Sequence, residues 1–320
     1  MSFLRSLPIL TALAALAQAT PAVAAPCAGV TFGAAFAASY TCDSLGTPSG
    51  LTGSLGGITF LDNNTVLIGG NANGPGGYIQ ALGVTRDGSN HITGFSTSSL
   101  YAAAPFIDGG LAFGPNGVLF ATGYSNNTVL QYLPGSTAPD KIVTLDAASS
   151  SVGSLAFVPA GFAGAGQAKV ISYSNGKWFG ATLTPDGLGT FNIALSEVVT
   201  IGGGPEGLAY IDGGNEGFGG NDTVLVSAYQ LGKVMAYDID ANGDPILSSA
   251  EEFMLGLSGA EGAVIDPMTG DFIFSTFGGG NQVVVVSGFD VPEPVSTPEP
   301  ASLALLGMSL AGLGWMRRRR

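Results

Sequence analysis

The chain has 320 residues, including 51 glycines, and its 23 acidic residues outnumber the ten lysines and arginines. Five of the ten basic residues, Arg5 and residues 317–320, lie near the two ends of the chain. The chain between them contains five basic and 23 acidic residues, which gives a net charge near −18. Such a chain excludes nucleic acid as a partner, because phosphate binding requires clustered lysine and arginine. An acidic excess favours solubility and attracts divalent cations.

The first 24 residues are predicted to be a secretory signal peptide. Arg5 supplies a positive charge, residues 7–17 are apolar, and residues 22–24 are the small residues of a cleavage site. We expect cleavage after Ala24. Pro26 precedes Cys27 where a lipoprotein cleavage box requires a small residue, so we expect no lipidation.

Cys27 and Cys42 are the only cysteines of the chain. In an oxidising compartment they are predicted to form a disulfide. Closing a loop of this length stabilises a fold by about 3 kcal/mol. Redox and zinc roles are less favoured, because the spacing is not Cys-x-x-Cys and one histidine adds too few metal ligands.

A five-residue phrase occurs five times in the chain. It begins with Gly or Glu, which is followed by Gly-Leu-Ala-Phe or a close variant of it. The copies are residues 56–60, 109–113, 153–157, 206–210 and 261–265, and their starts are separated by 53, 44, 53 and 55 residues. Each copy precedes a second run rich in β-branched residues, at 66–68, 118–120, 170–172, 224–226 and 272–274. Runs bounded by Gly, Asn and Asp predict strands, and a fixed period predicts a repeat fold.

Hairpins are predicted in the outer half of several repeats, with turns at residues 87–88, 186–187 and 242–243. Four strands per repeat of about 50 residues predict an all-β fold, a β-propeller spanning residues 25–290. The Gly-Leu-Ala-Phe phrase resembles propellers of the NHL and gluconolactonase-like kind.

Five blades are favoured for this propeller. The fifth repeat is too short for four strands, and the strand-like residues 30–32 and 39–41 could complete it, so N- and C-terminal strands together would close the ring. Six blades is the second interpretation, since a divergent blade could lie in residues 152–206. A two-sheet β-sandwich is the third.

Three acidic residues are candidate cation ligands. Glu206 and Glu261 occupy the same place in consecutive repeats, and Asp108 lies one position earlier in its own repeat. In gluconolactonase-like propellers, carboxylates at the mouth of the axis bind a divalent cation, so the resemblance implies a calcium site here, to which Asn63 or Asn126 would add oxygen atoms. The alternative is that each carboxylate only caps a turn or strand end.

A second candidate cation site begins at Asp238. Asp238, Asp240 and Asn242 match the opening of a calcium-binding loop. The match fails further on, because Pro245 takes the eighth place and Ser249 replaces the bidentate glutamate at the twelfth. A plain β-turn is favoured.

The last 30 residues comprise a Pro/Glu-rich linker at 291–300, an apolar run at 301–316 and four arginines at 317–320. Pro298-Glu299-Pro300, a hydrophobic helix and a basic cluster in this order resemble the PEP-CTERM sorting signal of Gram-negative bacteria. In that family the signal is recognised by the membrane protease exosortase. The resemblance implies export, transient anchoring in the inner membrane by residues 301–320, and transfer to the cell surface or the medium.

The apolar run can only just cross a bilayer. Sixteen residues give a helix of about 24 Å, against a hydrocarbon core of about 30 Å. The four arginines stay on the cytoplasmic side, which places the chain before Pro298 on the outer face. A retained single-span anchor is the alternative to processing.

Two functions remain open. The first is a non-catalytic surface or matrix protein that binds polysaccharide or protein, because PEP-CTERM signals tend to accompany exopolysaccharide production. The second is a divalent-metal-dependent hydrolase or lactonase of the gluconolactonase-like type. No catalytic residue is predicted: His91 is the only histidine and is read as a turn residue, and no nucleophile motif accompanies it, so a non-enzymatic role is favoured.

Overall fold

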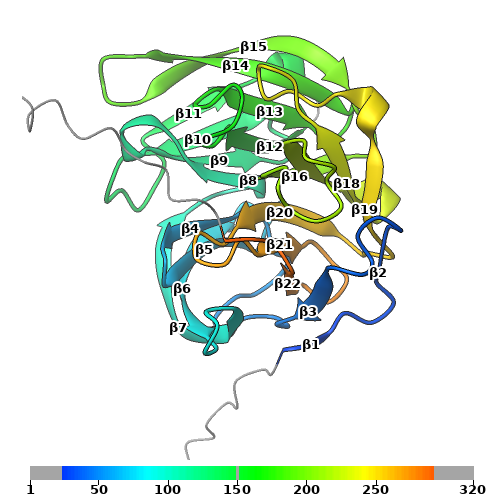
Figure 1. The fold of residues 1–320 in the computed structure, drawn as a ribbon. Coiled ribbons are helices and arrows are strands. Elements are labelled where there is room, and N and C mark those ends of the chain that lie inside the picture. The colour runs from blue at the N-terminus through cyan, green and yellow to red at the C-terminus, as the bar shows by residue number, and fades with distance from the viewer. Residues whose placement is uncertain (1–23, 149–150, 292–320) are drawn as a thin grey trace, which may run out of the picture.

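The computed structural model describes residues 24–148 and 151–291, which form a five-blade β-propeller. Figure 1 shows β15 and β7 at opposite edges of the molecule and β8, β16 and β20 near its centre. The all-β prediction and the favoured blade number are therefore confirmed. Most of the predicted signal peptide, the Pro-Glu-Pro motif and the C-terminal hydrophobic helix lie outside the described residues.

The blades are antiparallel sheets in which consecutive strands pair. Blade 1 contains β4 (Ile58–Asp62), β5 (Thr65–Gly70), β6 (Tyr78–Arg86) and β7 (Ile92–Ala103). Blade 2 contains β8 (Ile107–Phe113), β9 (Leu119–Gly123), β10 (Thr128–Tyr132) and β11 (Lys141–Thr144). Blade 3 contains β12 (Val152–Phe157), β13 (Ala168–Ser172), β14 (Lys177–Pro185) and β15 (Phe191–Thr200).

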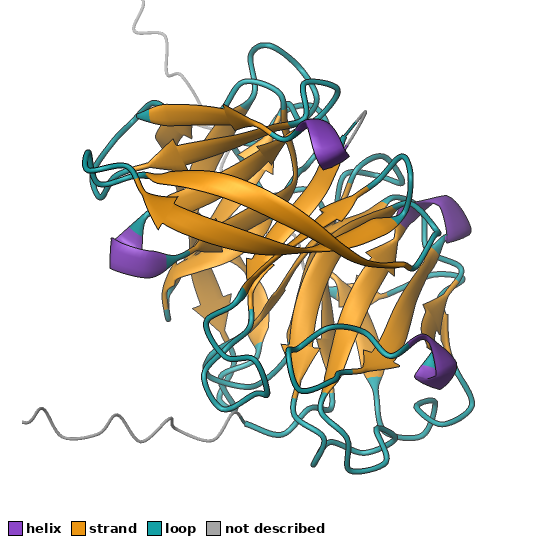
Figure 2. Ribbon diagram, turned by 90° about the horizontal axis from the view of Figure 1, so that it is seen from above, coloured by secondary structure: helices purple, strands orange, loops and turns teal. Residues whose placement is uncertain are grey.

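Blade 4 contains β16 (Pro205–Ile211), β17 (Thr223–Ala228), β18 (Lys233–Asp238) and β19 (Glu251–Leu255). The last segment of the chain gives blade 5 only β20 (Ala260–Ile265), β21 (Phe272–Thr276) and β22 (Val283–Ser287). Helical structure among the described residues is limited to short 3₁₀ turns, visible in Figure 2, and none of these is long and apolar enough to cross a membrane.

The repeated phrase forms the innermost strand of every blade, namely β4, β8, β12, β16 and β20. Its glycines let these strands approach closely around the axis. A Cβ added to Gly57 would lie 2.7 Å from the Gly110 carbonyl carbon, and one added to Gly262 would lie 2.6 Å from the Gly57 Cα. Such distances leave no room for a side chain, which explains the glycines at these positions.

The two ends of the chain close the ring in blade 5. β3 (Thr41–Ser44) pairs with β22, as predicted, and β1 (Ala25–Pro26) pairs with β3. The prediction for residues 30–32 was wrong in its partner: β2 (Thr31–Phe32) extends blade 4 by pairing with β19. The reason is geometric, because the loop after β1 crosses to the neighbouring blade before it returns to β3.

Cys27 and Cys42 form the predicted disulfide, with their Cα atoms 5.5 Å apart. It joins the residue after β1 to the second residue of β3, so it fixes the loop that carries β2. The N-terminal segment is therefore tied both to blade 5 and to blade 4.

The apolar core is divided into five clusters, one between each pair of adjacent blades. The cluster between blades 4 and 5 also takes in the N-terminal loop, where the rings of Phe36, Tyr40 and Phe253 pack together at centroid distances of 5.0 to 6.2 Å. Burial of these aromatic side chains holds the closing segment in place.

The predicted outer hairpins are present between β6 and β7 and between β14 and β15. The third differs. The turn at residues 242–243 lies in a small hairpin closed by an isolated bridge between Ile239 and Pro245, and a 3₁₀ turn at Leu247–Ser249 precedes β19.

Candidate functional site

Three acidic side chains from three blades meet at the propeller axis. Asp108 comes from β8, Glu206 from β16 and Glu261 from β20, each next to the start of its strand. One carboxylate oxygen from each lies within 4.8 Å of the others. The structure thus brings together the three residues that the repeat alignment singled out, and we refer to them as the axial trio.

Glycines in blades 2 and 3 provide the space for the Glu206 side chain of this trio. Gly109 and Gly153 hold the place in blades 2 and 3 that Glu206 holds in blade 4. A Cβ on Gly109 would lie 2.9 Å from Glu206 Oε2, and a Cβ on Gly153 would lie 3.0 Å from the same atom. A side chain at either glycine would therefore crowd the Glu206 carboxylate.

The axial trio is buried, with exposed fractions of 1% for Asp108, 3% for Glu206 and 2% for Glu261. Burial raises the pKa of Asp108 to about 7. Burial, together with the charge of neighbouring carboxylates, raises the pKa of Glu206 and of Glu261 well above the usual range. The site therefore favours protons or another cation over three free negative charges.

Hydrogen bonds satisfy this trio unequally. Ser151 Oγ donates to Asp108 Oδ2 at 2.9 Å. The side-chain amide nitrogen of Asn73, in the orientation that satisfies its hydrogen bonds, donates to Asp108 Oδ1 at 3.1 Å. A side-chain interaction between Asp108 and Glu261 lowers the pKa of Asp108 and raises the pKa of Glu261. Glu206 Oε2, in contrast, has no hydrogen-bond partner although it is buried. An unpartnered buried carboxylate oxygen is costly, and it marks the place where a ligand is expected.

Basic side chains do not compensate the axial trio. All five lysines and arginines in residues 24–148 and 151–291 form ion pairs elsewhere: Arg86 with Asp266, Lys141 with Asp186, Lys169 with Asp244, Lys177 with Glu197 and Lys233 with Glu252. A divalent cation would fit the site. Calcium takes oxygen ligands at 2.3–2.6 Å, so oxygens on either side of one ion lie up to about 5 Å apart, which agrees with the spacing of the trio.

Aromatic side chains stand beside the axial trio. Tyr173, Tyr229 and Phe277 each directly follow the second strand of their blade. The ring centroid of Tyr229 lies 5.8 Å from that of Tyr173 and 6.3 Å from that of Phe277. Burial raises the pKa of Tyr229, and the charges of Glu261 and Glu206 add to that shift, so this hydroxyl lies in their field. The sequence pattern indicates this aromatic position, although we did not predict it: Tyr124 holds the same place in blade 2.

A cavity of about 1080 Å³ lies along the axis. The later parts of all five innermost strands line it, and the lining includes the aromatic residues Phe60, Phe113, Phe157, Phe162, Tyr210 and Phe289. Gly109 also lines the cavity, and this residue adjoins Asp108 and Glu206 Oε2, so the cavity reaches the neighbourhood of the trio. Among the described residues of the lining, Asp212 and Asp290 are the charged ones, and both are acidic.

The other predicted ligands do not belong to the axial trio. Asp240 Oδ1 accepts hydrogen bonds from the backbone N–H groups of Asn242 at 2.8 Å and Asp244 at 3.0 Å, while Asp238 Oδ2 accepts one from Asn221. These contacts are those of a turn, and calcium binding by Asp238, Asp240 and Asn242 stays a prediction. Asn63 and Asn126 are exposed loop residues.

His91 lies in the loop before β7, in agreement with its interpretation as a turn residue, but it has a further role. Its Nδ1 lies 2.6 Å from Oδ2 of Asp271, a buried residue of blade 5. The hydrogen bond to Asp271 raises the pKa of His91, and burial opposes that shift. His91 thus links blade 1 to blade 5. A contact across 180 residues leaves no signal in the local sequence.

Comparisons with known proteins identify the sorting motif in the tail. Residues 296–320 match the family model of the PEP-CTERM protein-sorting motif. The chain therefore carries this sorting motif behind a five-blade propeller, and the motif implies a signal peptide, export, processing by exosortase and membrane-anchored transit to the cell surface. No curated protein matches the sequence of the chain.

Several solved structures are similar to this chain. The gluconolactonase of Xanthomonas campestris is 12% identical, with 85% of this chain and 99% of that chain covered and a TM-score of 0.45. The glutaminyl cyclase of Myxococcus xanthus is 10% identical, with 77% and 95% covered and a TM-score of 0.47. The virginiamycin B lyase of Staphylococcus aureus is 14% identical, with 73% of this chain covered and a TM-score of 0.39. This chain spans 66% of that lyase, just under two thirds of its length.

Proposed function

We propose that this exported protein is a surface-displayed binding propeller. It holds a divalent cation, with calcium as the candidate, on Asp108, Glu206 and Glu261, and it binds polysaccharide in the axial cavity without catalysing a reaction. The observation that carries the proposal is the unpartnered Oε2 of buried Glu206, within a trio of carboxylates that no basic residue neutralises, next to an aromatic-lined cavity.

The cavity suits a neutral sugar chain. Its volume of about 1080 Å³ slightly exceeds the usual range for ligand pockets, about 300–1000 Å³, and leaves room for more than one sugar ring. Aromatic rings such as Phe157 and Phe162 provide flat apolar surface for sugar rings, and Thr59, Ser154 and Asn215 offer hydrogen bonds to hydroxyl groups. The acidic residues Asp212 and Asp290 disfavour an anionic polymer.

The chemistry of the cavity supports binding rather than catalysis. Among its lining residues, Asp212 and Asp290 are the titratable acids, and Asp212 Oδ1 already accepts a hydrogen bond from the Gly214 N–H at 2.8 Å. A general base must lie within hydrogen-bond reach of its substrate and be available for the proton. The trio is not part of the lining, which approaches it at Gly109.

Calcium uptake tests the first part of this proposal. The full chain, purified in a polyoxyethylene detergent, should take up one calcium ion per chain in isothermal titration calorimetry. The double variant Glu206→Gln with Glu261→Gln should lose this uptake, because amides supply fewer and weaker ligand oxygens. Asp240→Asn, in the turn that resembles a calcium loop, is the matched control and should bind calcium as the parent chain does. Calcium uptake that persists in the double variant but vanishes in Asp240→Asn would contradict the axial assignment.

Polysaccharide binding tests the second part. Neutral and uronate-containing polysaccharides are compared on the same full chain, and the neutral polymer should bind more tightly. Phe162→Ala should weaken its binding about tenfold, the loss expected from removing one aromatic contact of about 1.4 kcal/mol. Leu188→Ala, an exposed apolar residue on the distant β14–β15 turn, is the control. Equal binding of both polymers, or no effect of Phe162→Ala, would contradict the proposal.

A second candidate function is a divalent-metal-dependent hydrolase or lactonase. The observation that favours it is the continuity between cavity and trio at Gly109, because a cation there would polarise a substrate carbonyl from the cavity side. Hydrolysis of aldonolactones by the full chain, abolished by Glu206→Gln, would establish this alternative and overturn the non-catalytic assignment.

A further inference from the structure

The sequence contains the Pro-Glu-Pro triplet twice, and the sorting motif accounts for only one copy. Residues 298–300 lie within the matched range 296–320, whereas residues 292–294 lie before it. The structure describes the chain as far as Val291, so the first copy directly follows the last described residue. Residues 292–295, which we call the connector, therefore join the described propeller to the matched motif.

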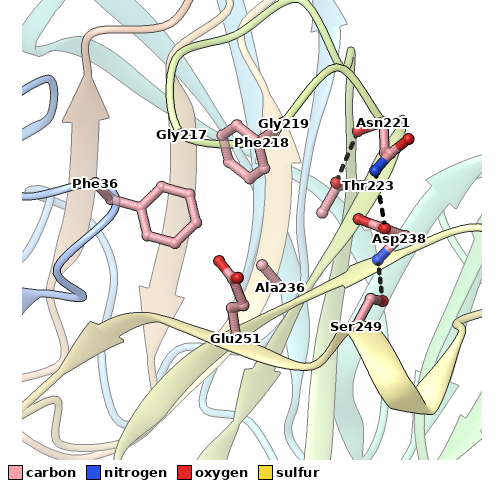
Figure 3. A pocket seen from close by; sticks show the side chains of 10 residues that line it. All are labelled: Phe36, Gly217, Phe218, Gly219, Asn221, Thr223, Ala236, Asp238, Ser249 and Glu251. Carbon is pink, nitrogen blue, oxygen red and sulfur yellow. Dashed lines mark hydrogen bonds between the residues drawn. The ribbon is translucent and has the colours of Figure 1, made fainter.

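The described chain ends in the wall of the axial cavity. Its last three residues, 289–291, all line that cavity. The Asp290 N–H donates to Oδ1 of Asn215, another lining residue, at 2.7 Å. Phe289 packs against Phe218 at a centroid distance of 6.2 Å, and Figure 3 shows Phe218 in the wall of a smaller pocket, of about 170 Å³, in blade 4. The point at which the connector begins is therefore fixed at the axial cavity, beside blades 4 and 5.

The axial cavity keeps apolar surface accessible. Its lining residues Phe60, Phe113, Phe157 and Phe162 are only half-buried, so part of each remains open to a ligand. Apolar surface gathered at one place on a protein in water marks an interaction site. At about 30 Å³ for each water-sized group, the cavity of about 1080 Å³ holds about 36 groups, the bulk of about four or five residues.

We propose that the connector of the same chain docks in this cavity. Proline-rich segments bind aromatic-lined grooves as extended helices, because prolines restrict the backbone beforehand and little entropy is lost. Such a helix has three residues per turn, so Pro292 and Val295 share one side, which packs on the rings, while Glu293 lies on another and faces the mouth. The acidic lining residues Asp212 and Asp290 are exposed, so salt screens their repulsion of Glu293.

Length and attachment favour the connector over other occupants. Four residues at about 3.1 Å each reach about 12 Å, which is comparable with the width of about 10 Å that the volume of the cavity implies. A segment attached at the wall has an effective concentration in the millimolar range. The apolar run at 301–316 is a poorer match, because a helix of about 24 Å length and 10 Å diameter exceeds the cavity.

Docking of the connector stands independently of the proposed function, but its consequence rests on that function. A polysaccharide that enters the cavity displaces the connector and frees about 12 Å of chain ahead of the sorting motif. Residues 298–300 then extend further from the propeller. Occupancy of the cavity and accessibility of the sorting motif are thereby coupled, and each changes the other to the same extent.

Thiol cross-linking tests the proposal on the full chain in lipid nanodiscs, where no free detergent competes for the cavity. The native cysteines are joined in a disulfide, so only introduced thiols react. In Val295→Cys with Ala112→Cys, the second thiol lines the cavity on blade 2, across the ring from blades 4 and 5. A short bismaleimide should join the two within one chain at least about tenfold faster than in Val295→Cys with Leu188→Cys, whose second thiol is on the exposed β14–β15 turn.

The two Pro-Glu-Pro copies provide a matched control. In the Val295→Cys, Ala112→Cys chain, Pro292→Ser with Pro294→Ser should slow cross-linking about tenfold, because the connector loses its ordered backbone and its proline contacts. Pro298→Ser with Pro300→Ser makes the same changes in the second copy and should leave the rate unchanged. Thermal melts of each variant verify that the fold persists.

Three outcomes would overturn docking of the connector. Equal rates in the Ala112 and Leu188 pairs would show that the connector does not visit the cavity. Cross-links between chains that increase with protein concentration would assign the cavity to a second copy, and cross-linking that occurs without lipid but is lost in nanodiscs would assign it to lipid. Fast cross-linking in a chain that binds no neutral polysaccharide supports docking and contradicts only the proposed function, so the two can fail separately.

Discussion

Buried carboxylates occur in two regions of this propeller, and their surroundings differ. Between the blades, Asp244, Asp266 and Asp271 are at most 6% exposed, and each has a basic partner: Lys169 at 2.6 Å, Arg86 at 2.6 Å and His91 at 2.6 Å. At the axis, Asp108, Glu206 and Glu261 are buried to the same degree without any such partner. Burial alone therefore does not set the axial trio apart from the other acidic residues, whereas burial without a basic partner does.

The paired carboxylates serve to hold blades and loops together. Asp244 receives the Lys169 ammonium and also the Trp178 indole N–H at 2.7 Å, which ties the loop after β18 to blade 3. Arg86 binds both oxygens of Asp266, at 2.6 Å and 3.1 Å, and so joins blade 1 to blade 5. Such pairs neutralise the buried charge and stabilise the fold, although Arg86 Nε and Asp271 Oδ1 still lack a hydrogen-bond partner.

Breaking a paired carboxylate should give the largest effect. Lys169→Met removes the cation beside Asp244 and should lower the free energy of unfolding by about 3–5 kcal/mol, because a buried charge is left without compensation. Urea denaturation of the full chain measures this. Lys233→Met, which breaks a half-exposed pair with Glu252, is the control and should cost at most about 1 kcal/mol. Equal losses in the two variants would show that burial does not govern these pairs.

Changing an unpaired carboxylate should have the opposite sign. In the presence of a chelator, Glu206→Gln should raise the free energy of unfolding by about 1–3 kcal/mol, since it replaces a buried acid whose charged form is disfavoured and whose Oε2 lacks a partner. The same denaturation experiment measures it. Glu197→Gln, which changes an exposed carboxylate paired with Lys177, should shift stability by less than about 1 kcal/mol. A Glu206→Gln chain that is less stable than the parent would contradict the comparison of the two regions.

The pH dependence should sharpen the same contrast. An acid with a raised pKa in the folded state favours its protonated form there, so the cation-free protein should lose stability as pH rises from about 4 through the raised pKa of Asp108, about 7. Calcium replaces these protons, so the increase in melting temperature on adding calcium should be larger at pH 8 than at pH 5. Differential scanning fluorimetry with calcium and with chelator measures both curves. A calcium effect independent of pH would mean that the raised-pKa carboxylates do not hold the ion.

The smallest effect is expected at His91, whose side chain is 37% exposed. Its hydrogen bond to Asp271 raises the pKa of His91 in the folded state. The stability that the charged pair contributes is therefore fully present below about pH 6.5, the unfolded value, and it is lost as pH rises through the raised folded value. His91→Gln should cost less than about 1 kcal/mol at pH 6 and still less at pH 9. A larger loss at pH 9 than at pH 6 would reverse the assigned sign.

Much of the fold followed from the period of the repeated phrase. Each copy has the residues of a strand that must pack against others around an axis, so their number predicts the number of blades, and the short fifth repeat predicts closure by the N-terminus. Equivalent positions of a ring face one centre, which is why the alignment of Glu206 with Glu261 was enough to predict that these side chains converge. The partner of β2 was not predictable, because a two-residue strand carries no pattern that selects one sheet edge over another.

The sequence by itself determined the sorting motif, the five repeated strands, the disulfide and the three acidic positions at the axis, since each of these depends on residues whose spacing is local or periodic. Only the tertiary structure decided which buried charges are compensated. Every lysine and arginine of the described chain lies beside a carboxylate outside the axial trio, and Glu206 Oε2 is left without a partner. Phe36 and Glu251, far apart in the chain, line one pocket. Those outcomes depend on contacts between segments far apart in the chain, and charge compensation is a property of distances in space that composition and order along the chain do not specify.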